Sequence, residues 1–83
     1  MKFHEVSKAM DEGKKIKLKD WDKKQYIQLA SGISYKAPTG DIVNCEHDAI
    51  GNMAVAFVGT SGVQMGWLAS QADMLADDWV FAE

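Results

Sequence analysis

The chain has 83 residues, 47% hydrophobic and 25% charged, with one proline and one cysteine. This length suits one domain spanning residues 1–83, and the composition excludes disordered and collagen-like classes. The formal net charge of −3 disfavours a general DNA- or RNA-binding protein, which needs a broad basic surface to displace counterions from phosphates.

The first predicted element is an amphipathic helix. Apolar residues recur among polar ones at spacings of three and four: Phe3, Val6, Ala9 and Met10. Gly13 suits a left-handed C-cap, so the helix should end near Glu12. Residues 15–19 then alternate lysine with Ile16 and Leu18, the period of a half-buried or edge strand.

Several strands are predicted next, separated by turns. Strand-forming residues fall into runs bounded by small and polar residues: 25–30, 33–36, 42–43, 53–58 and 63–68. The turn at 21–24 joins the lysine strand to the first of these as a hairpin, and the Gly-Thr-Ser-Gly sequence at 59–62 joins the last two. Gly66 suggests a bulge, and residues 44–52 lack periodicity and are expected to form a loop.

The C-terminal segment predicts a short helix and a closing strand. Ser70, with Asp73 three residues later, is typical of a helix N-cap, and the helix should run to residue 75 or 76. Residues 79–81 follow as a final strand. The predicted fold is therefore α+β: a small antiparallel sheet of about five strands packed around an N-terminal helix, with a short helix before the C-terminal strand.

The sequence contains no recognisable catalytic or metal-binding motif. The run Cys-Glu-His-Asp at 45–48 gathers reactive side chains, but neighbours on an extended chain point in different directions, and a metal needs three or four convergent ligands. We interpret 45–48 as a solvated loop and 59–62 as a hairpin turn rather than a phosphate cradle. We therefore expect no enzyme, no catalytic residue, no metal site and no cofactor.

The expected location is the cytoplasm. The single cysteine excludes an internal disulfide and fits a reducing compartment. The first eleven residues hold four charges and no long apolar run, unlike a secretory signal, and nowhere do 18 apolar residues stand together. We expect no membrane association.

The three tryptophans are the most informative residues for function. Trp79 precedes further apolar residues and is expected in the core, whereas Trp21 lies in a charged turn and Trp67 follows a glycine. An indole face can stack on a nucleotide base while lysines meet its phosphates, and eight of the nine lysines lie within residues 1–24. Core packing is the competing interpretation for Trp21 and Trp67, because large aromatic residues are most often buried.

One motif resembles a known family. The run from Trp67 to Trp79 is similar to W-x-[AP]-S-x-x-D-x-L-A-x-D-W, the signature of small phage and prophage proteins of the Thoeris anti-defence type two family. The opening of the chain agrees, with Phe3, a short helix, Glu-Gly-Lys-Lys at 12–15 and then Trp21. The resemblance covers almost the whole chain, and the C-terminal signature is its most specific part.

The resemblance implies a non-enzymatic sponge. Characterised family members bind cyclised ADP-ribose signals of the host Thoeris immune system and hold them intact, and some relatives hold cyclic oligonucleotides. It also implies a homo-oligomer, a dimer or a tetramer, with nucleotide pockets between protomers, in an infected or lysogenic bacterial host. The implied site residues are two stacking tryptophans, two side chains that bond to base or ribose, and a lysine for phosphate: Trp21, Trp67, Gln71, Asp73 and Lys23.

The sequence departs from the family pattern at two places, and it leaves two alternative functions open. Asp20 stands where many relatives have glycine, which places a negative charge near the expected pyrophosphate, and the variable segment 31–52 leaves the choice of cyclic nucleotide open. The alternative function is a phage or prophage protein-interaction or structural module without a nucleotide ligand. Hydrolysis of the signal is disfavoured because no acid, base or metal constellation is recognisable.

Overall fold

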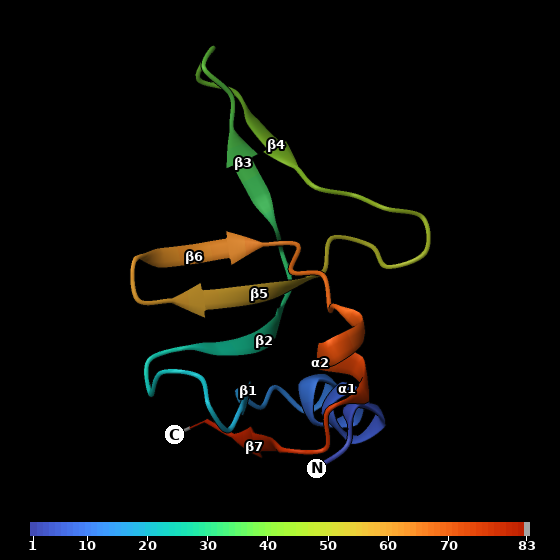
Figure 1. The fold of residues 1–83 in the computed structure, drawn as a ribbon. Helices are drawn as coiled ribbons and strands as arrows, with labels where there is room; N and C mark the ends of the chain where they lie inside the picture. The colour runs from blue at the N-terminus through green and yellow to red at the C-terminus, as the bar shows by residue number, and fades with distance from the viewer. Residues whose placement is uncertain (83) are drawn as a thin grey trace.

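The computed structural model describes residues 1–82. Within them, two helices and seven strands follow in this order: α1 (Phe3–Asp11), β1 (Ile16–Leu18), β2 (Tyr26–Ala30), β3 (Ser34–Lys36), β4 (Ile42–Asn44), β5 (Ala54–Gly59), β6 (Gly62–Met65), α2 (Gln71–Leu75) and β7 (Trp79–Phe81). Five strands form an antiparallel sheet in the order β6-β5-β2-β1-β7, and β3 and β4 form a separate ribbon (Figure 1). The predicted α+β class is confirmed.

The N-terminal helix forms where the apolar spacing places it. Its buried residues are Val6 and Ala9, one turn apart on the face toward the sheet. At the N-terminal end, the Glu5 carboxylate accepts a hydrogen bond from the Lys2 backbone N–H at 3.0 Å. At the other end, Gly13 has a φ of 81°, which favours glycine, and its N–H donates to a carbonyl of the last turn.

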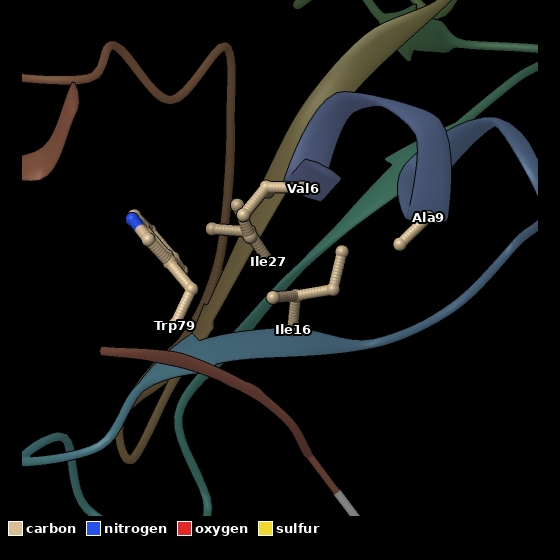
Figure 2. Close-up of a cluster of buried hydrophobic side chains, with 5 residues drawn as sticks. All are labelled: Val6, Ala9, Ile16, Ile27 and Trp79. Carbon is tan, nitrogen blue, oxygen red and sulfur yellow. The ribbon is translucent and has the colours of Figure 1, made fainter. Parts of the chain in front are cut away.

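The buried core is small and lies between α1 and one face of the sheet. Figure 2 shows its five members, which come from α1, β1, β2 and β7: Val6, Ala9, Ile16, Ile27 and Trp79. Ile16 pairs with Ile27 across β1 and β2, so both side chains face the helix. Each fully buried aliphatic side chain contributes about 1.5–3 kcal/mol to the free energy of folding, so stability depends on few residues.

The lysine-rich strand β1 lies inside the sheet. It pairs with β2 on one side and β7 on the other, so the edge-strand alternative is wrong and the half-buried alternative is correct. Alternation explains how the lysines are accommodated: Ile16 and Leu18 face the helix, whereas Lys17 points to the other face. There the Lys17 ammonium donates a hydrogen bond to the Trp21 carbonyl at 2.9 Å.

The hairpin of β5 and β6 is confirmed, although β6 ends at Met65 and not at residue 68. Gly66 adopts a φ of 83°, and its N–H and that of Trp67 both donate to the Val55 carbonyl at 3.0 Å. This irregular pairing is the bulge predicted from the glycine. It brings Trp67 against the hydrophobic core.

The ribbon of β3 and β4 projects away from the sheet (Figure 1). We call residues 34–44 the arm. At its tip, the Ala37 N–H donates to the Asp41 carbonyl at 2.8 Å, which closes the turn around Pro38. Residues 45–53 return to β5 without a helix or strand, as expected for 44–52 except that Asn44 ends β4.

Candidate functional site

The three tryptophans meet in one aromatic cluster. Ring centroids lie 5.4 Å apart for Trp21 and Trp79, 6.3 Å for Trp21 and Trp67, and 6.2 Å for Trp67 and Trp79. The interplanar angles of 75°, 78° and 83° make all three contacts edge-to-face. Each such contact contributes about 0.5–1.5 kcal/mol to the free energy of folding, beyond the contribution from burying the surface of the rings. The structure therefore brings together the two tryptophans that were expected in one site.

Trp79 forms the buried base of this cluster. It is 1% exposed and packs against Phe3 at 5.9 Å between centroids, which confirms its predicted place in the core. Its indole Nε1 donates a hydrogen bond to the Asp73 carbonyl at 2.9 Å, so its polar atom is satisfied. This bond ties α2 to the end of the sheet.

Trp21 and Trp67 are both half-buried and both pack against the core. Trp21 also meets Phe57 edge-on at 5.4 Å and 74°. Packing, the competing interpretation of these two residues, is therefore part of their role. Each residue nevertheless keeps part of its surface exposed.

The turn that carries Trp21 is held by its own side chains. The Asp22 N–H donates to Gln25 Oε1 at 2.9 Å, and Asp22 Oδ1 accepts from the Lys24 N–H at 2.9 Å. Lys17 holds the Trp21 carbonyl from within the sheet. The turn is thus a defined platform, and Lys23 stands on it as an exposed ammonium.

Asp73 and Gln71 lie on α2, and Asp73 has a clear structural task. Ser70 Oγ accepts from the Asp73 N–H at 3.1 Å, and Asp73 Oδ2 accepts from the Ser70 N–H at 2.8 Å. This reciprocal pair is a capping box, and it confirms the predicted N-cap at Ser70. Gln71 is exposed, and within residues 1–82 no hydrogen bond ties its side chain or that of Lys23 to the tryptophans.

The sequence-based prediction of the cluster omitted Phe57 and Lys17. Phe57 had a signal, because alternation along β5 places it on the same face as Val55, toward the core. The bond of Lys17 to the Trp21 carbonyl depends on the course of the following turn, which the spacing of residues does not reveal.

Four cavities over the described residues lie away from Trp21 and Trp67. One of about 350 Å³ is lined by residues at and around α1 and by Phe81. One of about 260 Å³ is lined by Asp11, Leu29, Ile50, Met53, Ala54 and Val55. A third, of about 200 Å³, lies between Lys14 and Phe81. A fourth, of about 240 Å³, lies at the β5–β6 turn.

Residues 1–82 contain neither a cluster of metal ligands nor a membrane-spanning helix. No group of three or more histidine, cysteine, aspartate or glutamate side chains stands close enough to hold a metal ion. Over the same residues, neither helix is long and apolar enough to traverse a bilayer.

The fold and the site define the class of protein. It is a small α+β protein in which half-buried tryptophans lie beside a helix-covered sheet. The chain belongs to the Tad2-like family, described as the Thoeris anti-defense 2-like domain, whose model matches residues 1–82. Among curated proteins, none matches the chain. The family name supports a role in Thoeris anti-defence, fits a phage protein and suggests a non-catalytic role.

Proposed function

We propose that this protein binds a cyclised ADP-ribose signal of the Thoeris system and holds it intact, so that the signal does not reach its effector. The family supports the anti-defence role. The observation that carries the ligand class is the contact of Trp21 and Trp67, whose ring centroids lie 6.3 Å apart, with both residues partly exposed. Stacking of a base on an aromatic side chain contributes about 1–3 kcal/mol to binding, which suits a planar adenine.

The polar residues of the proposed site stand on the segments that position the tryptophans. Lys23, on the turn of Trp21, supplies an ammonium for a phosphate. Gln71 supplies an exposed amide for the base or the ribose. Asp73 uses Oδ2 in the helix cap, which leaves Oδ1 as the acceptor for a ribose hydroxyl. Asp20 is exposed, so solvent and salt screen its repulsion of a pyrophosphate.

We infer that a second copy completes the site, in a dimer or a tetramer. Both tryptophans give part of their surface to their own core, so one chain offers one side of the ligand's surroundings. Enclosing most of the ligand surface requires walls on several sides. The protein would act in the cytoplasm of an infected or lysogenic bacterium, where the immune signal is made.

Calorimetry with a small panel of ligands tests the proposal. Cyclised ADP-ribose is expected to bind tightly and to stabilise the fold by about 2.7 kcal/mol at a concentration of 100 times Kd. Linear ADP-ribose carries similar charges and serves as the control for simple electrostatic attraction, and a cyclic dinucleotide tests the other ligand class. Chromatography of the released ligand should recover it unchanged. A folded protein that binds none of the panel refutes the proposal and favours the protein-interaction module.

A pair of neighbouring lysines provides a matched control for the site. Lys23 and Lys24 are both exposed on the same turn, so replacing either with glutamine changes the net charge equally. We expect Lys23→Gln to weaken binding about tenfold, because a hydrogen bond to a charged group contributes about 1.5–3 kcal/mol. Lys24→Gln should change the Kd less than threefold. Equal losses in the two variants would assign the effect to overall charge and remove Lys23 from the site.

A further inference from the structure

We propose that Gln64, on the edge strand β6, recognises the base of the bound nucleotide and selects adenine. The inference rests on the proposed function, because it concerns the same ligand, and adds to it a residue and a base preference. Stacking on tryptophan accepts any base, since every base has an aromatic face. Selection of one base therefore requires a hydrogen-bonding side chain beside the stacking rings.

The register of the β5–β6 hairpin places Gln64 on the same face of the sheet as the tryptophan cluster. Gln64 stands directly opposite Phe57, so the two side chains share a face, and the Phe57 ring lies 5.4 Å from that of Trp21. Two residues earlier on β5, the Val55 carbonyl accepts a hydrogen bond from the Trp67 N–H at 3.0 Å. Gln64 and Trp67 thus stand opposite positions of β5 that are about 7 Å apart, a spacing that a purine can span.

The sheet is open on this side of the cluster. α1 packs mainly on β1 and β2, and both helices lie away from the tip of the β5–β6 hairpin (Figure 1). Beside Gln64, the cavity of about 240 Å³ at the β5–β6 turn is also lined by Phe57 and Ser61. Phe57 therefore lines this cavity and contacts Trp21 as well. A base stacked on the tryptophans has room to extend its edge toward Gln64.

The Gln64 amide is available to a ligand. The residue is exposed, and among the described residues its side chain forms no hydrogen bond, whereas Gln25 and Gln28 both use theirs within the chain. Its backbone belongs to a paired strand, which positions the side chain more precisely than a loop would. An amide offers both a donor and an acceptor, so it can form two hydrogen bonds to one base edge.

The chemistry of an amide favours adenine. Glutamine accepts from the N6 amine of adenine and donates to N7, which forms a bidentate pair. Hypoxanthine has an oxygen in place of that amine and presents two acceptors, so the Gln64 amide can form only one of the two bonds. Guanine presents the same two acceptors at this edge. We expect a preference for adenine of about tenfold, toward the low end for a bidentate pair, because Gln64 is exposed.

Calorimetry with two ligands tests the assignment. The ligands are a cyclised ADP-ribose and its hypoxanthine counterpart, and the wild type should bind the first about tenfold more tightly. Gln64→Met keeps a side chain of similar length without either bonding group, so its two Kd values should agree within about twofold. The control Met65→Gln makes the reverse exchange on the opposite face of β6, where Met65 is 50% exposed, and should keep the preference. A loss of stability weakens both ligands equally and leaves the ratio of the Kd values unchanged.

Each outcome decides the assignment. A wild type that binds both ligands equally, or a Gln64→Met variant that keeps the preference, overturns the inference and leaves the proposed function intact, because cyclised ADP-ribose is still bound. Loss of the preference in Met65→Gln, or in Gln71→Met but not Gln64→Met, also overturns it. A wild type that binds neither ligand refutes the proposed function together with this inference. If Gln64→Met fails to fold by far-UV circular dichroism, Gln64→Thr provides the same comparison with a residue that favours strands.

Discussion

Replacing Trp21 with alanine is expected to destabilise the fold by about 3 kcal/mol. The substitution removes three edge-to-face contacts, with centroid distances of 5.4 Å to Phe57, 6.3 Å to Trp67 and 5.4 Å to Trp79. At about 1 kcal/mol each, these contacts sum to the low end of the roughly 3–5 kcal/mol measured for alanine in place of a buried aromatic residue. The low end is appropriate because Trp21 is half-buried. The total free energy of unfolding of an 83-residue domain is about 4–12 kcal/mol, so this loss is a large part of it.

Urea unfolding followed by far-UV circular dichroism measures this loss. The protein concentration must be equal for all variants, because self-association makes apparent stability depend on concentration. Trp21→Phe is the matched control, because it keeps an aromatic ring among the same neighbours and should lose less than half as much. A loss below about 1 kcal/mol for the alanine variant would refute the packing role of Trp21. Equal losses of unfolding free energy in Trp21→Ala and Trp21→Phe would show that the ring contacts do not stabilise the fold.

Two backbone features give further predictions. Ser70→Ala removes the side-chain cap of α2 and should cost about 1 kcal/mol, lowering the Tm by about 4–8 °C in a thermal melt. Ser7→Ala, at an exposed position within α1, is the control and should not lower the Tm, whereas equal effects would contradict the capping role. Gly66→Ala should lower the free energy of unfolding by about 1–2 kcal/mol, measured in urea, because its φ is 83°. Open space around the added Cβ excludes a clash with residues beyond its chain neighbours. Gly66→Asn should lose less stability than Gly66→Ala, since asparagine tolerates a positive φ better than alanine. A larger loss in the asparagine variant would contradict this explanation.

Most of the secondary structure could be predicted because its signals are local. The apolar spacing and Gly13 define α1, and the paired runs around residues 59–62 define the β5–β6 hairpin. The membership of strands in sheets could not be predicted in the same way. Residues 33–36 and 42–43 alternate like other short strands, yet they form the arm and leave β2 to pair with β5. That choice depends on long-range pairing, which alternation along one strand does not encode.

The interior position of β1 shows the same limit. Its lysines are compatible with an edge, where they would discourage pairing with other chains. They are equally compatible with an interior strand that has one face turned away from the helix, as Lys17 shows. The aromatic cluster depends on two features of the backbone. The turn after β1 carries Trp21, and the bulge at Gly66 brings Trp67 to the core. Its tryptophans could be selected from the sequence, but their edge-to-face contacts required the three-dimensional pairing.

Trp21 and Trp67 pack against the core and also form the proposed site, so substitutions at these positions alone cannot separate folding from binding. A variant that loses part of its folding free energy also loses apparent affinity, because only the folded protein binds the ligand. The exposed residues of the site lack this coupling. Lys23 makes no hydrogen bond to the tryptophans within residues 1–82, so its removal should leave stability within about 0.5 kcal/mol. Loss of binding in Lys23→Gln at unchanged stability is therefore stronger support for a ligand site than any effect of the tryptophan variants.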